Sequence, residues 1–121
     1  MRQVQLHNQT HPFQAPIRAG YCHTFLCRFR GLMLAPDLPE RGGLLLVEQS
    51  TSRVNASIHM LFMRYDLAVI WMDEQFRVVD RVLAKRWHSS YLPARAARYT
   101  LETRPEYLSE FQPGDQILVE E

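Results

Sequence analysis

Cysteine is scarce in this chain of 121 residues, in which Cys22 and Cys27 are the only two. Two cysteines are too few for the disulfide framework that holds many small secreted domains together. If their segment is helical, a spacing of five residues places the thiols about 140° apart, because each residue turns the helix by ~100°. The sequence therefore argues against a bridge between them.

Long apolar runs are also lacking. The most apolar stretch, residues 58–72, contains His59, Arg64 and Asp66, so it falls short of the ~18 uninterrupted apolar residues that a membrane helix needs. Residues 1–8 carry one charged side chain and no apolar core of a signal peptide. We therefore expect a cytoplasmic protein without a membrane span.

Charge of one sign is not in excess, since 14 basic residues face 13 acidic ones. A net charge of +1 creates no global field for gathering nucleic acid, and we see no specific nucleic-acid signal. No second pair of ligands accompanies Cys22, His23 and Cys27, so we predict neither a metal site nor a cofactor. The length fits a single domain over residues 1–121.

What the sequence does contain is a series of short strand patterns separated by turns. Alternation and short apolar runs predict strands over residues 2–6, 44–47, 57–63, 67–72, 76–83, 98–102 and 116–119. Residues 7–20 read as an irregular arm and Gly42-Gly43 as a flexible turn. Met60, Met63, Met72 and Trp71 are expected in the core.

Two short helices complete the predicted elements. Phe25 and Phe29 lie four residues apart in a segment over 21–33, a spacing that stacks side chains on one helical face. Thr103 followed by Glu106 has the form of a capping box for a helix over 104–111. The fold class we expect is mainly β: an antiparallel sandwich or small barrel, jelly-roll-like, with two short helices.

Several segments, in order, resemble the domain of unknown function 192 family. They are Arg30-Gly31-Leu32-Met33, Ile58-His59-Met60-Leu61-Phe62-Met63-Arg64-Tyr65, Phe76-Arg77-Val78-Val79, Tyr99-Thr100-Leu101-Glu102 and Gly114-Asp115. The resemblance covers residues 17–120 and implies a mostly β domain, but it implies no activity because the family has no established biochemical function. Where the family usually has an aspartate, this chain has Ala68. Asp66 would share that strand face, displaced by roughly 6 to 7 Å.

The first candidate site lies around residues 58–66. His59 and Arg64, with Asp66 nearby, could hold a carboxylate or phosphate. Their spacing places His59 and Arg64 on opposite faces of a regular strand, so a bulge or turn would be needed. The alternative is structural, with His59 bonded within the sheet and Arg64 paired with Asp66.

The second candidate site is the loop over residues 87–93. Arg86, Arg95 and Arg98 flank a stretch that contains Trp87 and His88, a mixture of groups common in binding loops. These arginines could form an anion-recognition face. The alternative is a solvated surface whose positive charge is balanced by the five acids of residues 105–121.

Together these patterns predict a non-catalytic binding module. Its partner would be a small polar or anionic ligand or another protein. The alternative is a small hydrolase-type enzyme that uses His59, Asp66 or His88. That alternative requires at least two of these side chains within hydrogen-bond reach in one pocket.

Overall fold

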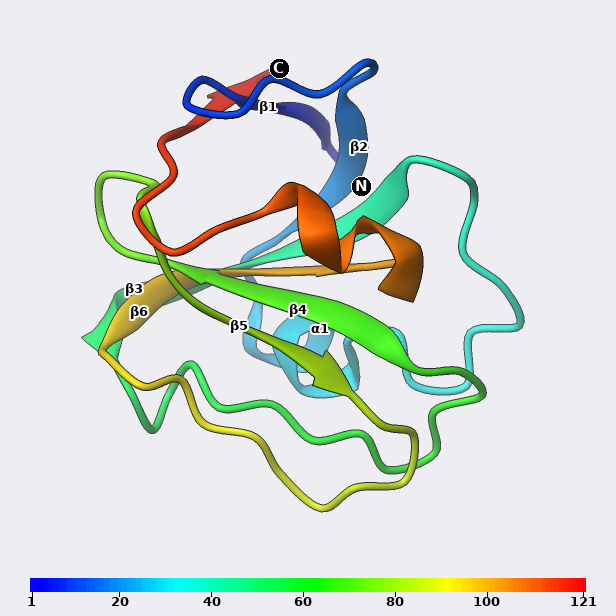
Figure 1. The fold of residues 1–121 in the computed structure, drawn as a ribbon. Helices are drawn as coiled ribbons and strands as arrows, with labels where there is room; N and C mark the ends of the chain where they lie inside the picture. Colours follow the sequence, from blue (N-terminus) through cyan, green and yellow to red (C-terminus); the bar gives the residue numbers. More distant parts are fainter.

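A computed structural model describes all 121 residues, and strands dominate it (Figure 1). Its elements are β1 (Gln3–Asn8), β2 (Ile17–Cys22), α1 (Phe25–Arg30), β3 (Gly42–Ser52), β4 (Leu67–Met72), β5 (Val78–Ala84), β6 (Ala97–Thr103), the 3₁₀ helix η1 (Pro105–Glu110) and β7 (Ile117–Glu120). No helix is long and apolar enough to cross a membrane.

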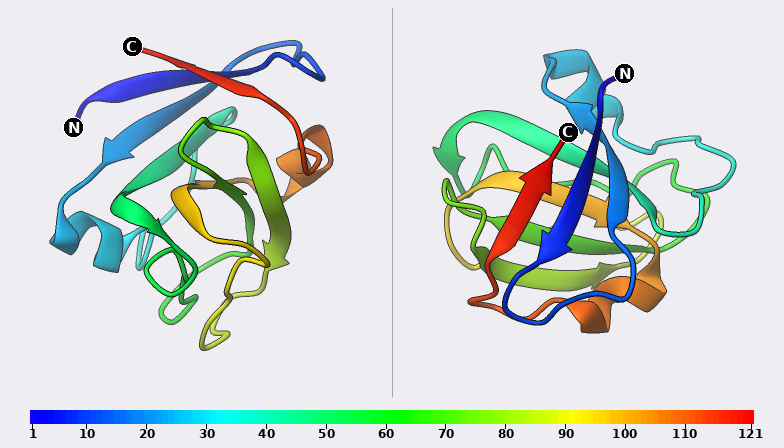
Figure 2. Two further views of the ribbon diagram at one scale, coloured as in Figure 1. Left: turned by 90° about the vertical axis from the view of Figure 1, so that its left-hand side faces the viewer. Right: turned by 90° about the horizontal axis from the view of Figure 1, so that it is seen from above.

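All seven strands belong to one sheet, in the order β5-β4-β6-β3-β2-β1-β7. The sheet curls into a half-barrel, as Figure 2 shows from two sides. Its two edge strands approach each other where Arg77 and Gln116 form an antiparallel bridge and the Val78 amide donates to the Asp115 carbonyl at 2.8 Å. The mainly β prediction is confirmed and the shape is roughly barrel-like, whereas a two-sheet sandwich is not confirmed. We expected an antiparallel sheet, but β2 pairs with β3 in parallel. The sheet is therefore mixed.

The concave side of the sheet encloses the first of two apolar clusters. Its largest fully buried members include Phe111, Leu6 and Leu101. Tyr107 and Phe111, from η1 and the residue after it, join this cluster. The second helix therefore closes one side of the interior instead of lying free on the surface.

The second apolar cluster covers the outer side of β3, β6 and β4. Alternate β4 residues Leu67, Val69 and Trp71 belong to this outer cluster, whereas Ile70 and Met72 belong to the inner one. Every residue of β4 is therefore buried, which explains why this strand reads as a continuous apolar run. The prediction that Met60, Met63, Met72 and Trp71 are core residues is confirmed.

Three predictions about the strands were wrong. Residues 57–63 form no strand beyond a single bridge between Ile58 and Tyr91. Met60 and Met63 are buried in the outer cluster, so the apolar character of this segment comes from covering the sheet and not from pairing within it. Conversely, the expected irregular arm contains β2, and Gly42-Gly43 begins β3. A Cβ on Gly43 would lie 2.6 Å from the Glu102 carbonyl oxygen, so this glycine lets β6 approach.

Both helices differ from their predicted form. The first is shorter than 21–33, because Tyr21 and Cys22 end β2 and α1 covers only Phe25–Arg30. The second lies at the predicted place but is a 3₁₀ helix without a side-chain cap. Thr103 does not cap it, since its buried hydroxyl donates to the Gly42 carbonyl at 2.7 Å.

Candidate ligand pocket

A pocket of about 360 Å³ lies between α1 and the outer side of β3 and β6. One wall is α1, a helix of six residues with none buried. Such a short helix is marginal by itself, so contacts to the sheet must fix it. The Thr24 hydroxyl accepts a hydrogen bond from the Cys27 amide at 3.2 Å, which caps its N-terminus.

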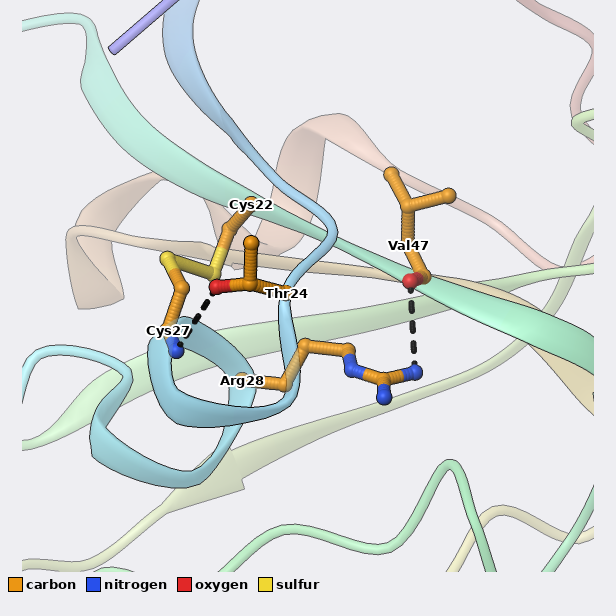
Figure 3. The surroundings of a disulfide bond; sticks show 5 residues. All are labelled: Cys22, Thr24, Cys27, Arg28 and Val47. Carbon is orange, nitrogen blue, oxygen red and sulfur yellow. Dashed lines mark hydrogen bonds between the residues drawn. A yellow bond between two sulfur atoms is a disulfide. The ribbon is translucent and has the colours of Figure 1, made fainter.

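A disulfide between Cys22 and Cys27 joins the end of β2 to α1 (Figure 3). The expectation of no bridge was wrong because it placed both cysteines on one helix. Cys22 ends β2 and only Cys27 is helical, so the turn at residues 23–24 folds the helix back against the strand. The two Cα atoms are 5.7 Å apart, within the range that a disulfide spans.

An ion pair provides the second anchor of α1. The Arg28 guanidinium donates to the Glu48 carboxylate at 3.0 Å and extends toward the Val47 carbonyl (Figure 3). Both side chains are mostly buried, with exposed fractions of 16% and 12%. Burial raises the pKa of Glu48, and Arg28 opposes that shift. Arg28 is therefore committed to holding the helix over β3.

The floor of the pocket contains a buried carboxyl group. Glu102 pairs with Leu44 of β3 and Val69 of β4, both members of the outer cluster, so its side chain faces the pocket. It is 5% exposed, and its Oε1 is shielded from solvent without a hydrogen-bond partner. Burial raises the pKa of Glu102 from 4.5 to about 7. The hydroxyl of Thr100, two residues away on the same face, is also buried without a partner.

Gly31 lies directly against this carboxyl group. A Cβ at residue 31 would be 3.2 Å from Oε1 of Glu102. The φ angle of Gly31 is +52°, a conformation that other residues adopt only with strain. Glycine therefore ends α1 and lets the end of the helix pack closely on the carboxyl group.

His59, which the sequence predicted as a site residue, lines the pocket. Its Nε2 donates to the Phe29 carbonyl at 3.0 Å, and its ring centroid lies 5.6 Å from that of Phe29. Phe29 in turn stacks on Phe25. In the neutral ring Nδ1 is then an acceptor, and it is buried without a partner.

Arg64, Asp66 and Arg86 form a separate group. The Asp66 carboxylate accepts from the Arg86 backbone amide at 2.9 Å and lies 3.4 Å from the Arg86 guanidinium. Lys85 is a weaker partner at 3.7 Å. Arg64 contributes its backbone carbonyl to Arg86, so the ion pair expected between Arg64 and Asp66 is replaced by one between Arg86 and Asp66.

The remaining predicted site residues have other neighbours. His88 is exposed, with its ring 4.4 Å from that of Tyr91. Arg98 donates from Nε to the Glu48 carbonyl at 3.2 Å, and Arg95 is exposed. No hydrogen bond joins any two of His59, Asp66 and His88. The structure therefore does not assemble the arrangement that the hydrolase alternative requires, and the anion-recognition face stays a prediction.

The balance expected between the basic segment and the C-terminal acids occurs at one position. Arg104 lies 3.3 Å from Glu106. Glu110, Glu120 and Glu121 instead pair with residues from the first half of the chain. No group of three or more His, Cys, Asp or Glu side chains is placed to hold a metal ion.

Sequence reasoning missed Glu102, Thr100 and Arg28. Alternation along residues 98–102 places Thr100 and Glu102 together on the polar side of a strand, but it does not indicate what that side contacts. The assignment of faces was right, but α1 and residues 55–63 cover that side. Nothing local in the sequence signals this cover. Three segments that resemble the family, residues 30–33, 58–65 and 99–102, do meet in the pocket.

Comparison with known proteins shows the family to which this chain belongs. The family model for domain of unknown function 192 (DUF192), described as "Uncharacterized ACR", matches residues 4–119. The chain therefore belongs to the DUF192 family, whose function is uncharacterised.

Individual relatives carry the family name UPF0127. A Thermococcus kodakarensis protein is 49% identical over 79 residues, which cover 65% of this chain and 48% of that protein. A Thermococcus sibiricus protein is 42% identical over 103 residues, covering 83% and 64%. A Pyrococcus furiosus protein is 36% identical over 95 residues, covering 78% of each. The chain thus spans about half the length of some curated relatives it matches.

Two solved structures share the fold. A protein of unknown function from Novosphingobium aromaticivorans has a TM-score of 0.77 at 16% identity, covering 96% of this chain and 83% of that chain. A Sinorhizobium meliloti protein has a TM-score of 0.84 at 15% identity, covering 97% and 92%. At these identities the likeness concerns the fold alone.

Reduction of the disulfide is expected to loosen the α1 wall. A bridge that closes a loop of about six residues stabilises by about 2 kcal/mol in the loop-entropy description. We expect the amides of Arg28 and Gly31, which close the helix, to lose hydrogen-exchange protection after reduction, while those of Val69 and Ile70 in β4 keep theirs. Unchanged protection at Arg28 and Gly31 would contradict a role for the bridge in fixing α1.

Proposed function

We propose that this protein is a binding module whose α1 pocket takes a small polar ligand. The observation that carries the proposal is the Glu102 carboxyl group, which is buried at the pocket floor without a hydrogen-bond partner. Leaving a buried polar group unsatisfied costs about 1 to 3 kcal/mol, and more if it is charged. A ligand that donates a hydrogen bond to Glu102 would recover that cost.

The size and lining of the pocket support a small molecule. Its volume of about 360 Å³ lies in the range of roughly 300 to 1,000 Å³ that small-molecule sites occupy. Leu46, Ile58 and Met63 offer apolar contacts beside the polar floor. Apolar contacts beside polar groups that fix orientation are typical of a small-molecule site.

The loop arginines have weaker support as a ligand site. Arg86 already has a carboxylate partner in Asp66, and Arg98 already donates to the β3 backbone. An incoming anion would have to compete with these contacts. We therefore place the ligand in the α1 pocket, with His59 as the sequence-predicted residue that belongs to it.

The disulfide bears on where this pocket would work. Disulfides persist in oxidising environments and are uncommon in the cytosol of most organisms. The cytoplasmic location expected from the sequence stays a prediction. We expect the pocket to be well formed only where Cys22 and Cys27 are oxidised.

A thermal-shift screen with matched variants tests the proposal. Ser50 is exposed at the rim of the α1 pocket, so Ser50→Trp should fill its mouth without disturbing the core. Ser109, exposed beside a second pocket near Tyr107, provides the control Ser109→Trp. Small polar compounds that raise the Tm of the wild type should do so for Ser109→Trp and not for Ser50→Trp. The proposal fails if no compound raises the Tm, or if the shifts persist in Ser50→Trp.

A further inference from the structure

We infer that the ligand carries a protonated amine on an apolar stem, with its ammonium group bound to Glu102. This inference rests on the proposed function, because it names the ligand class of the same pocket. Two observations support it: Glu102 has no cationic partner in the protein, and apolar and aromatic side chains line the pocket above Glu102.

No side chain of the protein supplies a cation to Glu102. Of the two pocket arginines on α1, Arg28 is paired with Glu48, and Arg30 has an exposed side chain with no ion pair to an acid. The remaining groups near the carboxyl are His59, whose Nε2 is bonded to a carbonyl, and Tyr65. Burial, followed by the charges of Asp37 and Glu102, raises the pKa of the Tyr65 hydroxyl. The carboxyl group at the floor thus has no cationic partner within the protein.

The β-strand neighbours of Glu102 add nothing polar that could satisfy it. Leu44 and Val69 are its cross-strand partners, and both are buried and apolar. Thr100 could offer a hydroxyl, but that hydroxyl is itself without a partner. A compact cation with several N–H donors could bond both Glu102 and Thr100.

The walls above the floor fit an apolar stem. Ile58 and Met63 line the pocket from residues 55–63, which cover the outer side of the sheet, and Leu46 lines it from β3. Phe25 and Phe29 stack on each other at a centroid distance of 6.3 Å and also line it. Aromatic ring faces attract cations and also contact apolar groups. The two phenylalanines therefore favour an amine with an apolar stem, both during entry and in the bound state. An anionic ligand bound at the floor would instead place a second negative charge beside the Glu102 carboxylate.

Binding of an ammonium group requires the ionised form of Glu102. Because the carboxyl group of the free protein is protonated below about pH 7, affinity for the amine should rise about tenfold per pH unit up to that pH. It should then level off until the amine itself loses its proton near about pH 10. A neutral alcohol, which needs no carboxylate charge, should not show this rise.

The test is an NMR titration of the full chain with three probes that differ in charge: phenethylamine, phenethyl alcohol and hydrocinnamate. We expect phenethylamine to bind tightest and to shift the amides of Gly31, Thr100 and Glu102. The substitution Glu102→Gln keeps the size of the side chain and removes its charge. It should weaken phenethylamine binding by about 10- to 100-fold, whereas Glu106→Gln on η1, an exposed acid, should leave it unchanged.

The outcomes separate this inference from the proposed function. If phenethylamine does not bind, or binds no tighter than the alcohol, or keeps its affinity in Glu102→Gln, the amine inference is wrong. The proposed function then stands or falls on the compound screen with Ser50→Trp. Amine binding that is lost in Glu102→Gln and rises with pH as described would support both.

Discussion

Glu102→Gln is expected to stabilise the unliganded protein by about 3 kcal/mol above about pH 8, and to change its stability little near about pH 4. Burial raises the pKa of the Glu102 carboxyl from 4.5 to about 7, and one pKa unit corresponds to ~1.4 kcal/mol. In the folded state the carboxyl group holds its proton over a pH range where the unfolded chain has lost it. The wild type therefore loses stability as pH rises from 4.5 to about 7, and the glutamine variant does not.

Denaturant unfolding at both pH values measures this difference. Glu106→Gln removes an exposed carboxylate and should change the free energy of unfolding by about 0.5 kcal/mol or less at either pH. If Glu102→Gln is destabilising near pH 8, the carboxylate makes favourable contacts in the folded protein. The pocket would then have no unsatisfied charge to offer a ligand.

Asp115→Ala is expected to destabilise the protein by about 3 kcal/mol at neutral pH. The Asp115 carboxylate is almost fully buried. It accepts hydrogen bonds from the Asn8 side chain at 2.8 Å and the Gln112 amide at 2.9 Å, and His11 contacts it at 2.8 Å. Alanine would leave these donors without their acceptor at the corner where β5 meets β7.

Acid unfolding checks the same carboxylate independently. Burial raises the pKa of Asp115, but the hydrogen bonds from Asn8, Gln112 and His11 outweigh burial, so the pKa lies below 3.8. The stability that Asp115 contributes is thus complete above pH 3.8 and is lost as pH falls through the folded-state value. The difference between wild type and Asp115→Ala should shrink over that acid range. Glu121→Gln, at an exposed ion pair, serves as control, and a constant difference down to low pH would contradict the assignment.

These two buried acids show why Glu102 points to a ligand. Both are at most 5% exposed, yet Asp115 is surrounded by donors and Glu102 has none. A fold that only needed to bury a carboxyl group could satisfy it as it satisfies Asp115. The absence of donors at Glu102, which lines the α1 pocket, is what a site completed by a ligand requires.

Local patterns were sufficient for part of the fold. The strands β4, β5 and β7 follow from short apolar runs, alternation and the turn residues between them, and they lie close to their predicted places. The failures come from tertiary context. Residues 57–63 are apolar because they cover a sheet, and the disulfide forms because a turn brings a strand end beside a helix.

The candidate site was less predictable than the fold. His59 was singled out, but its partner is the Phe29 carbonyl from α1, 30 residues away. Glu102 reads in the sequence as an ordinary polar position on the outer side of a strand. Its burial depends on α1 and on the segment around Ile58, and no residue near Glu102 encodes that cover.

The most direct check of an unsatisfied acid beneath α1 is its own titration, followed by NMR at the side-chain carboxyl carbon of Glu102 and assigned with Glu102→Gln. We predict a titration midpoint of about 7 for Glu102 in the unliganded protein, and a lower midpoint when phenethylamine is present. A midpoint near 4.5, the ordinary value, would mean that Glu102 is solvated or already paired, and would contradict the account.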